Sequence, residues 1–416
     1  MQEGQTIGLS VNYSSYSKSA QASFTEPYLF DKNVSAGIDI YRRDYSNFNY
    51  LNNDRNTTFE QTTTGGSLRL GVPLTEYASV IGSYTLNFDD VTLDPATYFT
   101  DRQNPPLFEC DPLLAGRYLC DAIGKRTSSI LGLTVALDTT DSRVRPTRGR
   151  TISVSTEFAG LGGDTKYVRV RGRAAQFWPI GAGFIFSLSG EGGAIRSFED
   201  RDQPGQDNVR LNDRFFLGEP QIRGFDIRGV GPRVLRYPYD GDGNLITDRD
   251  RIGDDAIGGN AYYLGRAEIE IPLGSGAREL GLRPSIFVDV GALFNVTPPV
   301  LTQNNPGNTI FIPSRDANGV PLYFSDNGTP TDFTDDVTLA IPNGGTVPTG
   351  YIALGQSTEP FQEVFLGNTA SPRISAGVGV NWNSPFGPLR IDLAYAIKKE
   401  PGDDTKLFSF NVGTQF

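Results

Sequence analysis

Residues 183–191 read Gly-Phe-Ile-Phe-Ser-Leu-Ser-Gly-Glu, and this short stretch decides the fold class. Its aromatic and leucine side chains stand at positions 184, 186 and 188, whereas Ser187 and Ser189 occupy the opposite side. Residues 391–398 and 168–173 alternate in the same way. Because successive side chains of a β-strand point to opposite faces, this period of two predicts strands with one apolar and one polar face. Helical periodicity is almost absent, so we expect an all-β chain.

Fifteen segments of this kind can be marked along the chain. A soluble β-sandwich would also alternate, but strands that cross a membrane need about 9–11 residues, and the length and regularity of these segments favour membrane strands. Single-chain bacterial barrels usually have an even number of strands, so we expect that one strand is missed or lost at the N-terminus. The predicted strands are 5–14, 18–27, 33–46, 60–74, 76–90, 126–138, 149–160, 164–179, 182–196, 208–218, 261–274, 281–294, 372–384, 387–398 and 406–416.

Short and long connections alternate between these segments. A barrel in the outer membrane has short turns at its periplasmic rim and long extracellular loops. We therefore predict one transmembrane antiparallel β-barrel domain over residues 1–416, with an extracellular cap at 295–371. The expected short turns are 28–32, near Glu76, 161–163, 180–181, 275–280 and 385–386, and the long connections are 91–125, 197–207, 219–260 and 295–371.

Composition excludes several classes of protein. No stretch approaches the roughly 18 apolar residues of a transmembrane helix, so a membrane could be crossed only by strands. The net charge of −11 argues against a nucleic-acid partner, because binding to phosphates needs a basic face. The chain has no histidine, which excludes outer-membrane proteases and phospholipases that rely on a histidine base. No nucleophile elbow or phosphate loop occurs, so we expect no enzyme and no cofactor.

Two cysteines, Cys110 and Cys120, flank a segment rich in Pro, Gly and Asp that is typical of a loop. We predict a disulfide, which would stabilise the fold by about 2–3 kcal/mol and would persist in the periplasm or at the cell surface. Two cysteines without histidine do not suit zinc. Residues 240–244, Asp-Gly-Asp-Gly-Asn, place carboxylates at alternate positions, but Leu245 and Arg251 depart from a calcium loop. We expect a surface turn there and no metal.

Residues 221–233, inside the long connection 219–260, read Gln-Ile-Arg-Gly-Phe-Asp-Ile-Arg-Gly-Val-Gly-Pro-Arg. This segment resembles the V/I-R-G-F/Y motif of the Omp85 family, in which a long extracellular loop folds back into the barrel lumen and its arginine pairs with acidic residues of the wall. The resemblance assigns this role to Ile222, Arg223, Gly224 and Phe225. About ten strands precede the motif and five follow it, which fits its place in that family.

Strand alternation indicates the acidic partners. Residues 286–291 read Ile-Phe-Val-Asp-Val-Gly; the apolar positions 286, 288 and 290 would face lipid, so Asp289 would face the lumen. This stretch resembles the F-x-D-x-G motif of the family, and Glu268 matches its second wall acid. Because a guanidinium can bind a carboxylate through two parallel hydrogen bonds, we hypothesise that Arg223 and Asp289, with Glu268 nearby, hold the loop 219–260. The alternative is that Arg223 is a solvated loop residue.

The C-terminal segment carries apolar residues on one face and ends with an aromatic residue, which resembles the sorting signal of outer-membrane barrels in general. The residues are Phe408, Phe410, Val412 and Phe416, together with Thr414.

Other segments also resemble Omp85 proteins: an early hairpin at 23–41, a turn containing Asp141, Pro146 and Gly149, and a turn at 383–389. The chain departs from the family at its start, where we expect the periplasmic POTRA domains to be missing from this sequence. Residues 5–14 match the second strand of the 16-strand family barrel, so we expect the first strand to be missing.

The resemblance implies a protein of the bacterial outer membrane that folds and inserts other β-barrel proteins without covalent chemistry, through a seam between its first and last strands. It implies as partners unfolded outer-membrane proteins, assembly-complex lipoproteins, periplasmic chaperones and the lipid bilayer. Two alternatives stay open. A passive porin or channel would share the alternation but would not require the arginine loop, and another Omp85 member, such as a two-partner secretion transporter, would share the motif.

Overall fold

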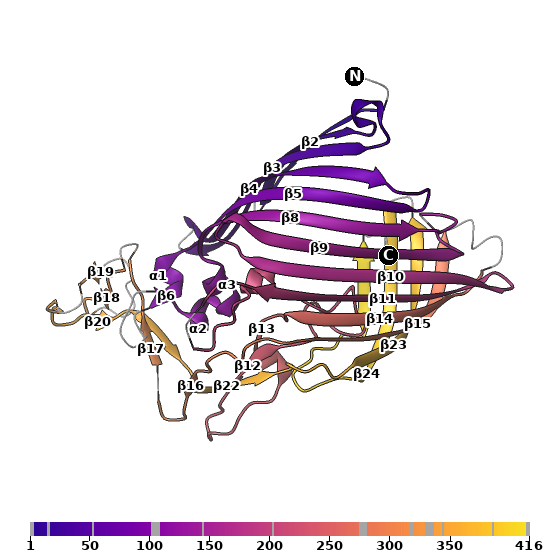
Figure 1. The fold of residues 1–416 in the computed structure, drawn as a ribbon. Coiled ribbons are helices and arrows are strands. Elements are labelled where there is room, and N and C mark those ends of the chain that lie inside the picture. Colours follow the sequence, from indigo (N-terminus) through magenta and orange to yellow (C-terminus); the bar gives the residue numbers. More distant parts are fainter. Residues whose placement is uncertain are drawn as a thin grey trace.

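The computed structural model describes residues 4–14, 17–51, 54–100, 109–143, 145–201, 204–273, 281–308, 310–316, 319–328, 337–342, 345–384 and 387–412. A single antiparallel sheet of fourteen strands dominates it (Figure 1), with every strand next to its predecessor in the chain order. The all-β, antiparallel architecture predicted from the alternation is confirmed. The strands are β1 (Thr6–Tyr13), β2 (Ser17–Glu26), β3 (Ser35–Leu51), β4 (Asp54–Pro73), β5 (Ala78–Leu93), β8 (Gly124–Asp138), β9 (Gly149–Gly163), β10 (Tyr167–Gly181), β11 (Phe184–Ser197), β14 (Ala261–Glu270), β15 (Leu282–Phe294), β23 (Arg373–Ser384), β24 (Gly387–Lys398) and β25 (Phe408–Val412).

One of the fifteen predicted strands is wrong. Residues 208–218 contain the short 3-10 helix η2 (Leu211–Asp213), and only isolated bridges join Phe215 to Gly259 and Leu217 to Val230. Their apolar residues alternate because Phe215 and Leu217 are buried in a core that the loop forms with side chains of β9, β10, β11 and β15. Nine strands of the sheet therefore precede the arginine motif, rather than about ten, and five follow it.

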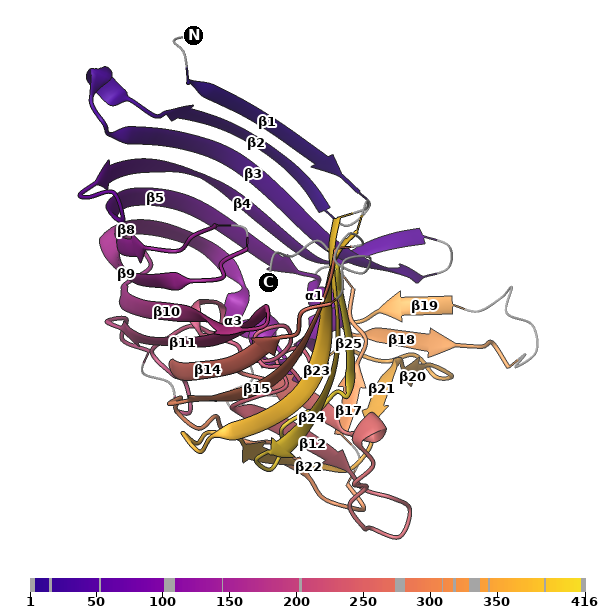
Figure 2. The ribbon, with the colours of Figure 1, turned by 90° about the vertical axis from the view of Figure 1, so that its right-hand side faces the viewer.

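The sheet curls around an interior, as Figure 2 shows along β1 to β5, and its strand order begins with β1 and ends with β25. Within the described residues no hydrogen-bonded ladder joins β1 to β25. Each of these two strands therefore has a neighbour in the sheet on one side only.

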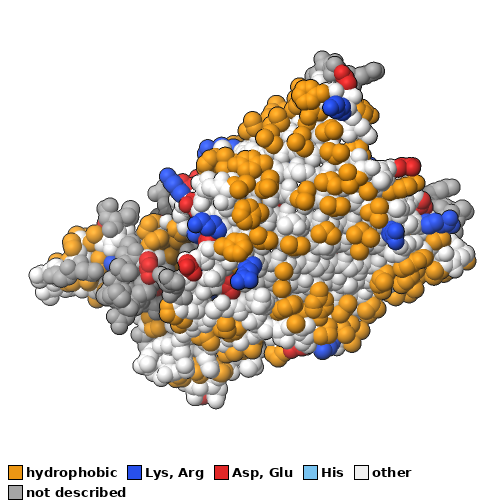
Figure 3. Space-filling view, in the orientation of Figure 1, with side chains coloured by type: hydrophobic (Ala, Val, Ile, Leu, Met, Phe, Trp, Pro, Cys, Tyr) orange, Lys and Arg blue, Asp and Glu red, His pale blue; other side chains and the backbone are white. Residues whose placement is uncertain are grey.

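The outer face of the sheet is apolar. Leu133, Ile286 and Leu393 are about half exposed, and hydrophobic side chains spread over the strands in Figure 3. Alternate positions of the same strands point inward, where Asp289 and Asp392 are buried. This is the arrangement expected of strands whose outer face meets lipid, because an apolar core is not needed when the lumen is polar.

The connections at the two ends of the sheet differ in size. At one end the connections are short: 27–34, 74–77, 139–148, 182–183, 271–281 and 385–386. Of the last two, residues 274–280 and 385–386 lie outside the described part of the chain. The three longest connections, 94–123, 198–260 and 295–372, all leave the other end and form a cap (Figure 1). The short turn expected at 161–163 belongs to the cap end, because β9 runs to Gly163 and β10 begins at Tyr167.

The cap contains regular secondary structure. Its largest sheet joins the two longest connections, in the order β13 (Gly253–Ala256), β12 (Arg233–Pro238), β22 (Phe361–Leu366) and β16 (Gln303–Asn304). Two smaller sheets pair β17 (Ile310–Pro313) with β21 (Gly355–Thr358), and β18 (Leu322–Ser325) with β19 (Val337–Ala340) and β20 (Ile352–Ala353).

The connection 94–123 holds the short elements α1 (Pro95–Tyr98), β6 (Phe99–Thr100), β7 (Glu109–Cys110), α2 (Pro112–Ala115) and α3 (Arg117–Ala122). The predicted disulfide is present: it links Cys110 and Cys120, whose Cα atoms lie 5.5 Å apart. The 3-10 helices η1 (Leu29–Asp31) and η3 (Arg249–Arg251) complete the described helical elements. None of the described helices is long and apolar enough to cross a membrane.

Candidate functional site

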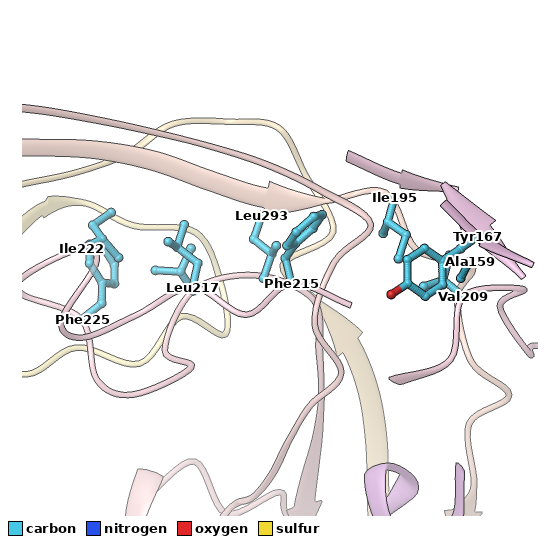
Figure 4. Close-up of a cluster of buried hydrophobic side chains, with 10 residues drawn as sticks. Ala159, Tyr167, Ile195, Val209, Phe215, Leu217, Ile222, Phe225 and Leu293 are labelled. Carbon is cyan, nitrogen blue, oxygen red and sulfur yellow. The ribbon is translucent and has the colours of Figure 1, made fainter. Parts of the chain in front are cut away.

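The arginine motif begins the loop 219–260 and is packed inside the sheet by apolar side chains. Ile222 and Phe225 are completely buried, and they continue a row of apolar contacts that includes Leu217 and Leu293 of β15 (Figure 4). Burial of an isoleucine or phenylalanine side chain typically contributes about 1.5–3 kcal/mol. The two apolar residues that flank Arg223 and Gly224 therefore hold this part of the loop against the wall.

Arg223 forms the centre of the site. Its Nε donates to Asp289 Oδ2 at 2.8 Å and its Nη2 to Asp289 Oδ1 at 2.6 Å, which is the bidentate geometry of an arginine fork. The backbone N–H of Arg223 also donates to Asp289 Oδ2 at 3.0 Å, and Nη1 donates to Glu268 Oε2 at 2.9 Å. The structure thus brings together the three charged residues that the sequence singled out, on β14, β15 and the loop.

Three further charged residues, none of which was predicted from the sequence as a site residue, complete the cluster. Arg390 of β24 donates through Nε to both oxygens of Asp392, at 3.0 and 2.9 Å, and through Nη2 to Glu268 at 3.4 Å. Arg266 of β14 donates to Asp289 at 3.3 Å and to the carbonyl oxygen of Gln221 at 3.0 Å. With these residues the cluster contains three arginines and three carboxylates. Alternation could have placed these side chains on the inward face, since Arg266 shares that face with Glu268, and Arg390 and Asp392 flank the outward Ile391. It could not have shown that they meet in one cluster, because that depends on which strands are neighbours across the interior.

An aromatic ring packs against the guanidinium group of Arg223. The Cζ atom of Arg223 lies 3.2 Å from the ring centroid of Phe287, which is buried on the inward face of β15. A cation over an aromatic face is attracted by the ring quadrupole, and more strongly where water is excluded. Gly377 of the neighbouring β23 makes room for this ring, since a Cβ atom there would lie 2.8 Å from Phe287 Cζ.

Gly224 allows the loop to approach the wall closely. Its φ of +86° lies in the left-handed region that glycine adopts without strain. A Cβ atom at this position would lie 3.1 Å from Ser375 Cβ and 3.4 Å from Ala394 Cβ. The motif therefore needs glycine both for the turn of its backbone and for the contact with β23 and β24.

The same loop is bound to the connection between β24 and β25. The backbone N–H of Asp226 donates to the carbonyl of Asp404 at 3.1 Å, and that of Lys406 donates to the carbonyl of Gly224 at 3.2 Å. Glu219 accepts from Lys406 Nζ at 3.0 Å and from Asn411 Nδ2 of β25 at 3.1 Å. The hydrogen bond to Glu219 raises the pKa of Lys406 above its ordinary value. The loop thus contacts the last strand of the sheet directly.

A second buried ion pair supports this connection. Arg373 at the start of β23 donates through Nε to Asp403 at 2.9 Å, and neither side chain is exposed. The other nitrogens of Arg373 donate to the carbonyl oxygens of Gly367, Thr369 and Ser371. Asp403 also accepts from the backbone N–H of Gly231 at 3.4 Å. The connection 399–407 is therefore held from the wall and from the loop together.

The predicted C-terminal face is described in part. Phe408 and Phe410 are each 53% exposed on the outer side of β25, and Ser409 between them is buried inside. The side chain of Val412 and the whole of Phe416 lie outside the described part of the chain.

Residues 240–244 form a turn in which Asp240 accepts from the backbone N–H groups of Asp242 and Asn244. Across the described part of the chain, no group of three or more His, Cys, Asp or Glu side chains is arranged to hold a metal.

Comparisons with known proteins identify relatives that match almost the whole chain. The chain is 26% identical over 416 residues to the outer membrane protein assembly factor BamA of Neisseria meningitidis, covering 99% of the chain and 43% of that protein. It is 25% identical to BamA of Neorickettsia risticii, covering 100% of the chain and 40% of that protein. The chain thus spans less than half the length of these relatives.

A solved structure shows the same fold. The crystal structure of Haemophilus ducreyi BamA lacking POTRA domains 1–3 superposes with a TM-score of 0.61 at 21% identity, over 98% of the chain and 64% of that structure. Like its bacterial relatives, the chain is an outer-membrane protein with a barrel-type sheet. The family model of the Omp85 superfamily domain matches residues 2–416. This match includes Arg223 and its partners Asp289 and Glu268, and the chain therefore belongs to the Omp85 superfamily.

Proposed function

We propose that the chain is the membrane domain of an outer-membrane protein assembly factor, which folds and inserts other β-barrel proteins. The observation that carries the proposal is the docked loop: Arg223 is bound to the wall while Glu219 and Gly224, in the same segment, bind the connection that leads into β25. The porin alternative does not require a loop that is tied through an arginine to the wall and through a second set of contacts to the last strand. The two relatives that cover the chain almost completely are assembly factors.

The mechanism we propose is non-covalent and uses the two end strands as a lateral seam. Ile7, Leu9 and Val11 of β1 are more than 60% exposed, and its opposite face carries the small residues Gly8 and Ser10. An unpaired strand edge can accept an incoming strand through backbone hydrogen bonds, which is the principle of β-augmentation. The loop supports β25 at one side of the seam, whereas β1 has only β2 as a neighbour in the described sheet.

The substrates under this proposal are unfolded outer-membrane proteins, and the site works in the bacterial outer membrane with the cap outside the cell. Assembly lipoproteins and periplasmic chaperones would be partners of the whole protein. Cluster residues act here as a latch that sets the position of the loop 219–260, and no covalent step is proposed for them.

A reconstitution experiment tests this function. The chain is inserted into liposomes, a small outer-membrane barrel protein is added from urea, and its folding is followed by the gel-mobility shift of folded barrels. We expect faster folding than in protein-free liposomes and a smaller acceleration with Arg223→Ala. Arg69→Ala, which changes an arginine on the opposite wall, is the matched control and should keep the parent rate.

The alternatives give different results in the same liposomes. A passive porin would leave the folding rate unchanged and would show a large, steady conductance in a planar bilayer. A two-partner secretion transporter would release an unfolded exported protein across the bilayer without accelerating barrel folding. Either result contradicts the proposed function.

A further inference from the structure

A cluster of arginines lies at the end of the sheet that is away from the cap. Arg148 closes the turn between β8 and β9, and Arg150 is the second residue of β9. Both side chains are exposed, and neither lies within 4.0 Å of a carboxylate among the residues that the structure describes. The chain as a whole has a net charge of −11, so a local excess of positive charge requires an explanation.

Arg150 points to the outside of the sheet. Along β9 the exposed residues Ile152, Val154 and Phe158 occupy even positions, whereas Glu157 is bound by Arg169 on the inward face. Arg150 shares the even positions and therefore extends from the lipid-facing side. It is opposite Gln176 on β10 in the strand register.

Aromatic and aliphatic side chains continue this outer surface at the same end. Trp178 is 39% exposed and stacks on Phe186 with ring centroids 5.4 Å apart, and Tyr77 and Ile180 are more than half exposed. Figure 3 shows Lys and Arg side chains next to hydrophobic ones at this end of the sheet. Aromatic residues gather where a barrel meets the lipid headgroups, and long arginine side chains there can extend to the polar layer.

The turn that carries Arg148 is ordered by its own hydrogen bonds. Asp141 accepts from the backbone N–H groups of Thr147 and Arg148, at 2.8 and 3.1 Å, and from the hydroxyl of Thr147 at 2.5 Å. Gly149 follows with a φ of +101°, and a Cβ atom there would lie 2.2 Å from the carbonyl oxygen of Thr139. The backbone positions of the two arginines are thus fixed before any ligand arrives.

We propose that Arg148 and Arg150, beside Trp178, form a binding site for the phosphate of an anionic phospholipid in the membrane leaflet at the short-turn end. An arginine fork matches the oxygens of a phosphate, and each basic residue near an anionic lipid surface strengthens binding by roughly fivefold. The outward direction of Arg150 and its continuity with the lipid-facing surface favour a lipid over an acidic protein. The inference rests on the membrane placement in the proposed function, with the short turns toward the periplasm, and is independent of insertase activity.

Tryptophan fluorescence tests the proposal, because the chain has two tryptophans, Trp178 and Trp382. The variant Trp382→Phe in liposomes leaves Trp178 as the reporter. Its quenching is measured with bromine-labelled phosphatidylglycerol and with equally labelled phosphatidylcholine at the same mole fraction. We expect about fivefold or greater enrichment of phosphatidylglycerol around Trp178. In the background of Trp382→Phe, the pair Arg148→Gln and Arg150→Gln should reduce the enrichment to near unity.

The control removes the same charge from the inner face. Arg171 and Arg173 lie on β10, the strand that also carries Trp178; Arg171 lies over the ring of Phe215 and Arg173 is bound to Glu191, both on the inner face. Changing both to Gln should keep the preference for phosphatidylglycerol. Loss of the preference in this control would show that only the net charge matters, and would overturn the site.

The remaining outcomes are also distinct. Equal quenching by both lipids in the Trp382→Phe parent would overturn the proposal and would favour an acidic protein surface as the partner of the two arginines. Loss of the preference on addition of inorganic phosphate would overturn it in favour of free phosphate. Absence of quenching by either lipid would mean that the chain is not in the bilayer, which contradicts the proposed function rather than this site alone.

Discussion

Two walls of the same sheet differ in what their inward side chains contact. The covered wall, β14, β15, β23 and β24, faces the loop 219–260, and its inward residues Asp289 and Asp392 are buried in ion pairs. The open wall, β1 to β4, has an inward ion pair of similar length, Arg69 with Asp39 at 2.6 Å, but the arginine side chain is 51% exposed. Strand alternation gives both walls inward charged residues, but only in the covered wall does the loop shield these residues from water.

This difference changes the energetic role of the charges. Burial of an ion pair costs desolvation energy that its attraction roughly offsets, so the pair specifies a position more than it adds stability. Removal of one buried partner is expensive, because the other charge stays behind without water. In the open wall water replaces a lost partner, and exposed pairs contribute little. The loop therefore fixes the positions of the inward charges in the covered wall, whereas the inward charges of the open wall near β1 can exchange their partners for water.

The largest effect should come from Arg223→Ala. It leaves Asp289 and Glu268 beside two remaining arginines in a buried site, and we expect a loss of about 3–5 kcal/mol in the free energy of unfolding in detergent. Arg69→Ala in the open wall should cost less than about 1 kcal/mol. Denaturant titration of both variants measures the contrast. Equal losses would mean that burial by the loop does not distinguish the two walls.

Charge reversal sharpens the same comparison without removing side-chain volume. Asp289→Lys would place a third cation next to Arg223 and Arg266, and the loop should leave the wall. Trypsin should then cleave the loop 219–260 faster than in the parent. Asp90→Lys, at a half-exposed carboxylate 3.8 Å from Lys125, is the control and should not change the cleavage. An unchanged digestion pattern in Asp289→Lys would count against the latch.

Gly224→Ala should have the next largest effect. A residue with a Cβ is strained at a φ of +86°, and the new methyl group would press on Ser375 and Ala394, so we expect a loss of about 1–3 kcal/mol. The inward Gly37 of β3 in the open wall is the control. A Cβ atom there would have its nearest contact at 3.6 Å, with Arg69, and Gly37→Ala should be tolerated. Similar unfolding midpoints for the two variants would refute the close approach inferred at Gly224.

Lys406→Ala tests the link between the loop and the last strand. Lys406 is 40% exposed, so loss of its bond to Glu219 should cost less than about 1 kcal/mol overall. The effect should be local: the amides of residues 408–412 should exchange with deuterium up to about fivefold faster, and those of β1 should not change. Lys18→Ala on β2 is the control. Faster exchange in both end strands would indicate general loosening instead.

The sequence predicted more of the sheet than of the site. Fourteen of the fifteen expected strands exist because alternation is a local property that each segment carries by itself. The failure at 208–218 has a physical reason, since Phe215 and Leu217 alternate in order to pack the loop and have no partner strand. The pair of Arg223 with Asp289 was accessible from a resemblance combined with alternation. The contributions of Arg390 and Asp392 depend on which strand lies beside which across the interior, and alternation alone does not provide that neighbourhood.

The turn with Asp141 should show the smallest effect, and it separates local order from order imposed by the loop. Hydrogen bonds from Thr147, above all that of its hydroxyl, and from the backbone of Arg148 lower the pKa of Asp141 from 3.8 to about 2. Because the folded pKa is depressed, the stabilisation of the turn is complete above pH 3.8 and is lost as the pH falls through about 2. The amide resonance of Thr147 in detergent micelles should therefore titrate with a midpoint near 2. Asp141→Asn should abolish this titration, whereas Arg223→Ala, which loosens the covered wall, should leave it unchanged. A midpoint near 3.8 would show that the hydrogen bonds from Thr147 and Arg148 do not hold the carboxylate of Asp141. A shift of the midpoint in Arg223→Ala would show instead that the order of this turn depends on the covered wall.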